Sequence, residues 1–204
     1  MMNQTSLKKT VAISLLSAIA VLIQAIAFPL PIFPAFLQMD FSDIPALIGG
    51  ILLGPAAGVL IEALKNFLHY LILGSLTGVP VGEFSNFIAG SLFIIAGTWF
   101  YKKKKNASSL IYGLIFATIF VSVIMTFANY FIIFPSYALF LGFTTDQAIA
   151  MSQSINHKIH SLFTLVVFAV LPFNLLKGMV LTIITVPIYS KLKSRLKTFV
   201  PAEK

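Results

Sequence analysis

Five polar side chains stand out because they interrupt apolar stretches of the sequence. Asn174 and Lys177 lie three residues apart in VLPFNLLKGMVL, Glu83 and Asn86 have the same spacing in VGEFSNFIAG, and MTFANYFIIFP contains Asn129. A spacing of three places both members of a pair on one face of a helix. Amides donate and accept hydrogen bonds together, whereas a lysine only donates. This combination suits noncovalent binding of a small flat molecule, such as a heterocycle whose edge alternates carbonyl and N–H groups.

The composition is that of an integral membrane protein. Of the 204 residues, 58% are apolar and only 10% are charged, and the mean hydropathy is +0.97. A soluble domain carries roughly 25% charged residues and could not bury this much apolar surface. The length fits a single membrane domain over residues 1–204, because no polar stretch is long enough to fold outside the bilayer.

Several kinds of chemistry lack the residues that they need. The chain has no cysteine, which excludes disulfides, thiolate metal sites and thiol nucleophiles. It has no G-x-x-x-x-G-K-[ST] motif, so it does not hydrolyse nucleotides through a P-loop. No catalytic constellation points to an enzyme, and HKIH at 157–160 is interpreted as an exposed loop rather than a metal site. We therefore expect a protein that is not an enzyme and that uses no metal or cofactor.

Apolar runs and breakers predict an all-α bundle of six transmembrane helices. Gly54 and Pro55 divide one long apolar segment, because glycine often ends a helix and proline suits its first turn. The predicted spans are approximately 10–28, 43–54, 55–74, 81–101, 108–133 and 172–190. The sequence does not decide how the long connection 134–171 folds. Its apolar part, 160–171, is either a re-entrant segment or an extension of the last helix.

The distribution of basic residues supports this topology. Six spans put both termini and the KKKK loop on one side, where eleven of the fourteen Lys and Arg residues then lie. Lysine and arginine concentrate on the cytoplasmic side of membrane proteins. The net charge of +8 is therefore interpreted as a topology signal with both termini cytoplasmic, and not as nucleic-acid binding.

The five polar side chains are expected at similar depth, near the outer surface. If the last helix starts at Pro172, Lys177 lies roughly 7–8 Å below that start. The prolines in FPLPIFPAFLQMD (28–40) forbid a regular helix. We expect this first loop to fold over the bundle as a cap. The cap would contribute four residues to the pocket: Phe28, Leu37, Met39 and Asp40.

Two structural alternatives stay open. Lys177 could pair with Glu83 while the asparagines bridge helices. A second polar set, Glu62, Lys65, Asn66 and His69, has helical spacing and is interpreted mainly as an i,i+3 ion pair with packing partners. The same set could instead form a proton relay, which would make the chain a proton-coupled carrier.

The whole chain resembles the substrate-binding S components of energy-coupling factor (ECF) vitamin transporters, and among them the riboflavin-specific ones. Four segments carry the resemblance through their order and spacing: AFPLPIFPAFLQMDFSDIPALIGGILLGPAAG, VGEFSNFIAG, MTFANYFIIFP and LPFNLLKG. None of the four is specific alone.

The resemblance implies a riboflavin-capture subunit in the bacterial cell membrane, with the vitamin bound near the outer face. It implies that Asn129, Asn174 and Lys177 contact the flavin or its ribityl chain. The resemblance gives weaker support to ligand contacts by Glu83 and Asn86. It also implies partners, a transmembrane coupling protein and two cytoplasmic ATPases that supply energy. The family's contact with the coupling protein uses an alanine pair on the first helix, for which Ser14 and Ala18 are the nearest small residues here. An S component for another vitamin is the alternative.

Overall fold

Long helices form most of the chain in this computed structural model, which describes residues 4–74 and 79–196. The α-helices are α1 (Gln4–Gln24), α2 (Asp43–Leu53), α3 (Pro55–Leu73), α4 (Val81–Lys104), α5 (Ala107–Ala128), α6 (Phe134–Leu141), α7 (Thr145–Gln153), α8 (Leu162–Leu165) and α9 (Leu171–Leu196). Two π-helical segments, η1 (Asn129–Ile133) and η2 (Val166–Val170), and two short strands, β1 (Phe28–Pro29) and β2 (Gln38–Met39), complete the fold.

Within the described residues, five helical segments are long and apolar enough to cross a membrane. They include the continuous stretches Ala107–Leu141 and Leu162–Leu192. The predicted span 43–54 corresponds to α2, whose 11 residues extend only about 16 Å. A hydrocarbon core is about 30 Å thick, so α2 alone is too short to cross it.

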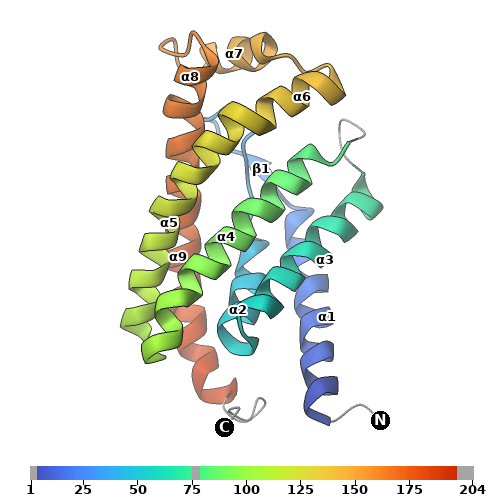
Figure 1. The fold of residues 1–204 in the computed structure, drawn as a ribbon, viewed down its shortest axis with the longest axis vertical. Helices are drawn as coiled ribbons and strands as arrows, with labels where there is room; N and C mark the ends of the chain where they lie inside the picture. The colour runs from blue at the N-terminus through green and yellow to red at the C-terminus, as the bar shows by residue number, and fades with distance from the viewer. Residues whose placement is uncertain (1–3, 75–78, 197–204) are drawn as a thin grey trace.

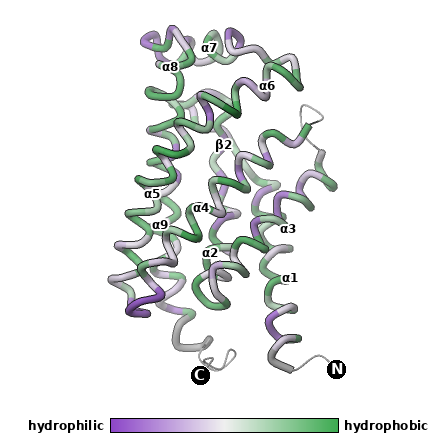
Figure 2. Tube along the Cα trace, viewed as in Figure 1, coloured by the Kyte–Doolittle hydropathy of each residue, from purple (hydrophilic) through white to green (hydrophobic). Residues whose placement is uncertain are grey.

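The start of α1, the end of α4 and the end of α9 lie at one end of the molecule (Figure 1). Helices α6, α7 and α8 lie at the opposite end. The turn between α4 and α5 is strongly hydrophilic, next to helices that are largely hydrophobic (Figure 2). The basic run Lys102–Lys105 therefore lies at the same end as the first turn of α1.

The predicted division at Gly54 is confirmed. Helix α2 ends at Leu53, Gly54 takes φ 99°, and Pro55 begins α3. A positive φ is readily available to glycine. The two helices form a tight hairpin, because a Cβ on Gly58 would lie 2.9 Å from the Cα of Gly50.

The predicted boundaries near two prolines are wrong, for a shared reason. The fifth span was expected to end at 133 and the last to begin at 172, but both helices continue through Pro135 and Pro172. A helical proline clashes with the carbonyl four residues earlier. Here that carbonyl belongs to η1 or η2, whose wider turns make room for the proline ring. The apolar segment 160–171 is therefore an extension of the last helix.

Close helix packing gives a first testable prediction. A Cβ built on Gly113 of α5 would collide with the carbonyl oxygen of Gly97 on α4. Gly113→Val is expected to lower the free energy of unfolding by about 1–3 kcal/mol, because a backbone atom cannot move aside easily. Thermal unfolding of the purified protein in detergent measures this loss.

Gly142→Asn is the matched control. Gly142 has φ 63° and open space around its Cα, and asparagine tolerates this left-handed conformation. The control should unfold close to the wild-type temperature. Equal stability of Gly113→Val and the wild type would show that α4 and α5 do not pack as described.

Candidate ligand-binding site

The first loop, residues 25–42, lies against the bundle and is fixed there by aromatic contacts. Its strands β1 and β2 pair antiparallel, with Phe28 opposite Met39. The Phe33 ring packs edge-on against Phe173 of α9, with centroids 5.3 Å apart, and Phe36 packs similarly on Phe134 of α6 at 5.8 Å. The first span was predicted to end at residue 28. Helix α1 ends earlier, at Gln24, because the chain turns there into loop 1.

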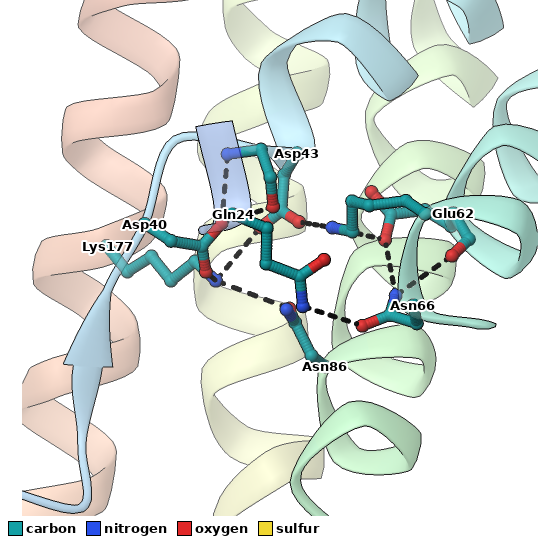
Figure 3. A network of polar contacts seen from close by, with 9 residues as sticks. Gln24, Asp40, Asp43, Glu62, Asn66, Asn86 and Lys177 are labelled. Atoms are coloured by element: carbon teal, nitrogen blue, oxygen red, sulfur yellow. Dashed lines mark hydrogen bonds and ion pairs between the residues drawn. The ribbon is translucent and has the colours of Figure 1, made fainter. Parts of the chain in front are cut away.

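The centre of the site is a partly buried cation bound by two acids. Lys177 Nζ lies 3.0 Å from Asp40 Oδ2 and 3.0 Å from Asp43 Oδ2, and it donates to Asn86 Oδ1 at 3.5 Å. These partners come from loop 1, from the first turn of α2 and from α4, so one side chain of α9 connects three other elements. Figure 3 shows Lys177 pointing between Asp40 and Asn86.

A second buried cation extends this cluster across the bundle. Lys65 Nζ lies 2.6 Å from Asp43 Oδ1 and 2.7 Å from Glu62 Oε2, and both Lys65 and Glu62 are fully buried. The network continues through Asn66, which donates to Glu62 and accepts from Gln24 Nε2 at 3.2 Å (Figure 3). The predicted i,i+3 pair between Glu62 and Lys65 is confirmed.

Asp43 is the shared member of this network, which we call the two-lysine cluster: Asp40, Asp43, Glu62, Lys65 and Lys177. Buried charges are costly unless each has partners of opposite sign, and each lysine here has two carboxylates. In loop 1, Asp40 also accepts hydrogen bonds from the Ser42 hydroxyl and from the Ser42 backbone N–H, the latter at 2.9 Å.

Asn129 and Asn174 both lie next to π-helical turns. Asn129 begins η1 and Asn174 follows η2 by one turn, and each donates its Nδ2 to the carbonyl four residues earlier, Met125 at 2.7 Å and Val170 at 2.9 Å. Among the described residues, neither amide oxygen accepts a hydrogen bond. Each asparagine therefore keeps an acceptor for another molecule, at the kind of helix irregularity that is frequent at functional sites.

A small cavity adjoins Asn174 and Lys177. It measures about 30 Å³, and its walls come from α2, α4, α5 and α9: Asp43, Ala89, Phe93, Thr118, Val121, Asn174, Lys177, Gly178 and Leu181. One water molecule would fill such a space, whereas small-molecule pockets measure about 300–1,000 Å³. The space beside Asn174 and Lys177 is therefore too small to hold a flat heterocycle in this structure.

The structure brings some predicted site residues together and separates others. Asn86, Asp40 and Lys177 meet, but the alternative pairing of Lys177 with Glu83 is wrong. Glu83 Oε1 lies instead 3.5 Å from Nδ1 of His69 on α3, so His69 turns toward α4.

The predicted positions of two site residues relative to the ends of their helices are also wrong. Because the last helix begins at Leu162, Lys177 lies about 22 Å along it instead of 7–8 Å, and Asn129 lies about 18 Å from the end of α6 at Leu141. Both are therefore well inside their helices.

The loop residues differ in exposure. Met39 and Asp40 are buried, Leu37 is half-buried against an apolar cluster from α6, α7, α8 and η2, and Phe28 is exposed beside Phe41. Sequence reasoning missed Asp43, which joins the two lysines. Its position in the first turn of a helix has an ordinary explanation, since acids are favourable there, and nothing in the sequence distinguishes that role from ion pairing.

Comparison with known proteins decides the family. Residues 8–189 match the profile of the ECF transporter, substrate-specific component. The chain belongs to this family. This S component is 42% identical to the riboflavin transporter FmnP of Bacillus subtilis (strain 168) over 186 residues, covering 91% of this chain and 92% of that protein. It is 37% identical to the riboflavin transporter RibU of Staphylococcus aureus (strain TCH60) over 196 residues, covering 96% of each.

A solved structure of the S component of a bacterial ECF transporter has the same fold. It superposes with a TM-score of 0.73 at 37% identity and covers 93% of this chain and 98% of that one. The helical architecture described above is therefore that of an ECF S component.

Proposed function

We propose that this S component captures riboflavin at the outer side of the bacterial cell membrane and passes it inward with the energy of a separate ATPase module. The observation that carries the proposal is the 42% identity to a riboflavin transporter over 91% of the chain. The polar groups at Asn174 and Lys177, beneath a loop rich in apolar residues, fit the same ligand.

Riboflavin suits these side chains chemically. Its ring edge alternates carbonyl and N–H groups, which the paired donor and acceptor of an asparagine amide can match. We assign this edge and the ribityl hydroxyls to Asn129, Asn174 and Lys177, with Asn86 reaching the ligand beside Lys177. Glu83 has a lesser part because His69 is its nearest partner.

Loop 1 acts as the lid in this proposal. Phe28, Leu37 and Met39 would cover the flat apolar faces of the ring, and Asp40 would fix the loop to α9 through Lys177. The cavity beside Asn174 and Lys177 has room for about one water molecule, so riboflavin binding requires a movement that enlarges it. We assign that movement to loop 1, which contacts Lys177 through Asp40.

The membrane topology is proposed to have six crossings with both termini cytoplasmic. The common end of α1, α4 and α9 in Figure 1 then faces the cytoplasm and carries the lysine run. Helix α2 would complete its crossing together with loop 1, since α2 is too short alone.

Helix α1 offers the surface for the coupling protein. Ser14 and Ala18 are exposed on one face, beside the exposed apolar side chains of Val11 and Leu15. Small residues at a spacing of four let a second helix approach closely within a membrane. Two ATPases on the cytoplasmic side would complete the transporter.

Removal of either asparagine amide is expected to weaken riboflavin binding. Asn129→Ala and Asn174→Ala should each raise the Kd about 10-fold or more, because a buried polar group of the ligand loses its partner. Quenching of riboflavin fluorescence by the purified protein gives the Kd.

The control is Gln153→Ala, at the end of α7, which should bind as the wild type does. Unchanged affinity in both asparagine variants would remove these residues from the binding site.

Transport by the complete system is tested in bacterial cells that cannot synthesise riboflavin. Cells that express this chain together with a coupling protein and two ATPases should grow on low external riboflavin, and cells with inactive ATPases should not. Uptake into vesicles that is driven by a proton gradient without the ATPases would contradict the proposal. It would favour a carrier based on Glu62, Lys65 and His69.

A further inference from the structure

An apolar groove lies between α4 and α5 on the outside of the bundle, away from the two-lysine cluster. Its volume is about 370 Å³, within the range of ligand pockets. Carbon side chains at helical spacing form its walls: Leu92, Ile95, Ala96, Trp99, Phe100, Phe116 and Phe120. A long apolar molecule would lie along these helices.

Aromatic rings shape this groove. The Phe116 and Phe120 rings stack with centroids 5.7 Å apart and an interplanar angle of 11°, and Phe100 packs on Phe116 at 5.3 Å. Trp99 is 63% exposed at the end nearest the α4–α5 turn. Tryptophan is enriched where hydrocarbon meets lipid headgroups, so this end of the groove lies at headgroup level.

A strongly basic turn adjoins the same end. Lys102, Lys103 and Lys104 are exposed in the last turn of α4, which is the hydrophilic turn in Figure 2. The sequence contains no Asp or Glu between Glu83 and Asp146, so neither helix of the hairpin supplies an acid near these lysines. Basic clusters next to a transmembrane helix attract anionic lipids.

We propose that this groove binds one acyl chain of an anionic phospholipid whose phosphate is held by Lys102, Lys103 and Lys104. Charge selects this occupant. A zwitterionic lipid would fill the apolar groove equally well but would gain less from three adjacent cations, and a partner helix would need acidic residues at its end. This lipid site is separate from the riboflavin site and does not depend on it.

Trp99 is the single tryptophan of the chain and lines the groove, so it reports occupancy directly. The vitamin-free protein is reconstituted in vesicles of unlabelled phosphatidylcholine that contain either dibrominated phosphatidylglycerol or dibrominated phosphatidylcholine. Bromine quenches tryptophan fluorescence on contact. At equal mole fraction and low salt, the anionic lipid should bind about threefold more strongly or better.

Two comparisons test the role of the lysines. The preference should disappear in the variant Lys102→Gln/Lys103→Gln/Lys104→Gln and should remain in Lys8→Gln/Lys9→Gln, which removes basic residues from the same end of the molecule. Salt at 0.5 M, where the Debye length is about 4 Å, should reduce the preference for the anionic lipid in the unmodified protein. This measurement tests the charge dependence even if the triple variant does not fold.

Three results would overturn the proposal. Equal quenching by both lipids would mean ordinary contact with the bilayer. A preference for the anionic lipid that persists in the triple variant would mean that residues other than Lys102, Lys103 and Lys104 bind the headgroup. Shielding of Trp99 from both lipids would mean that a protein helix or a second copy of the chain covers the groove.

Discussion

Lys177→Met is expected to weaken riboflavin binding by about 100-fold or more. The substitution removes a donor that we place on the ligand. It also leaves Asp40 and Asp43, both buried and each 3.0 Å from the lost ammonium, with reduced compensation. Loss of one partner from a buried charge pair costs about 2–5 kcal/mol in binding, which is consistent with this factor. Fluorescence titration of riboflavin measures the change.

Two further variants separate binding from folding. Lys158→Met removes an exposed lysine between α7 and α8 and should leave the Kd unchanged. The double variant Asp40→Asn/Lys177→Met removes one carboxylate together with the cation. It should therefore unfold at a higher temperature than Lys177→Met alone, while its affinity for riboflavin stays low. Wild-type affinity in Lys177→Met would refute the assignment of Lys177 to the ligand.

Lys65→Met is expected to destabilise the protein more than any exposed substitution. Lys65 is fully buried between Asp43 and Glu62, and its removal leaves two buried carboxylates facing each other. Loss of one member of a buried ion pair costs about 3–5 kcal/mol of stability. Thermal unfolding in detergent should show a large decrease in the midpoint.

A second substitution provides the control for this effect. Glu62→Gln/Lys65→Met removes one carboxylate together with the cation, so the double variant should be more stable than Lys65→Met alone. If both variants unfold at the wild-type temperature, the two-lysine cluster does not contribute to stability as described.

Much of the fold could be predicted because the signals were local. Apolar length predicted the long helices, and the Gly54–Pro55 pair predicted the break between α2 and α3. The prolines at 135 and 172 misled the prediction of helix ends. Whether a helix stops at proline or widens into a π turn depends on the tertiary packing of both helices, which a local pattern does not contain.

The site was predicted in part for a similar reason. Residue type and spacing pointed to Asn174, Lys177 and Asn86 as candidates, since polar groups are rare in transmembrane helices, and the structure places Asn86 and Asn174 near Lys177. The sequence did not show which acidic residues pair with Lys177. Asp40 and Asp43 lie 137 and 134 positions before Lys177, and only the folded path of loop 1 and α2 brings them to it.

The most direct test of the riboflavin proposal is the visible absorption spectrum of the protein, purified in mild detergent from cells grown without added vitamin. We expect a bound flavin spectrum at about one flavin per chain, or saturable quenching of added riboflavin fluorescence if the vitamin is lost during purification. A colourless protein that does not quench riboflavin fluorescence would contradict the riboflavin assignment and leave an S component for another vitamin.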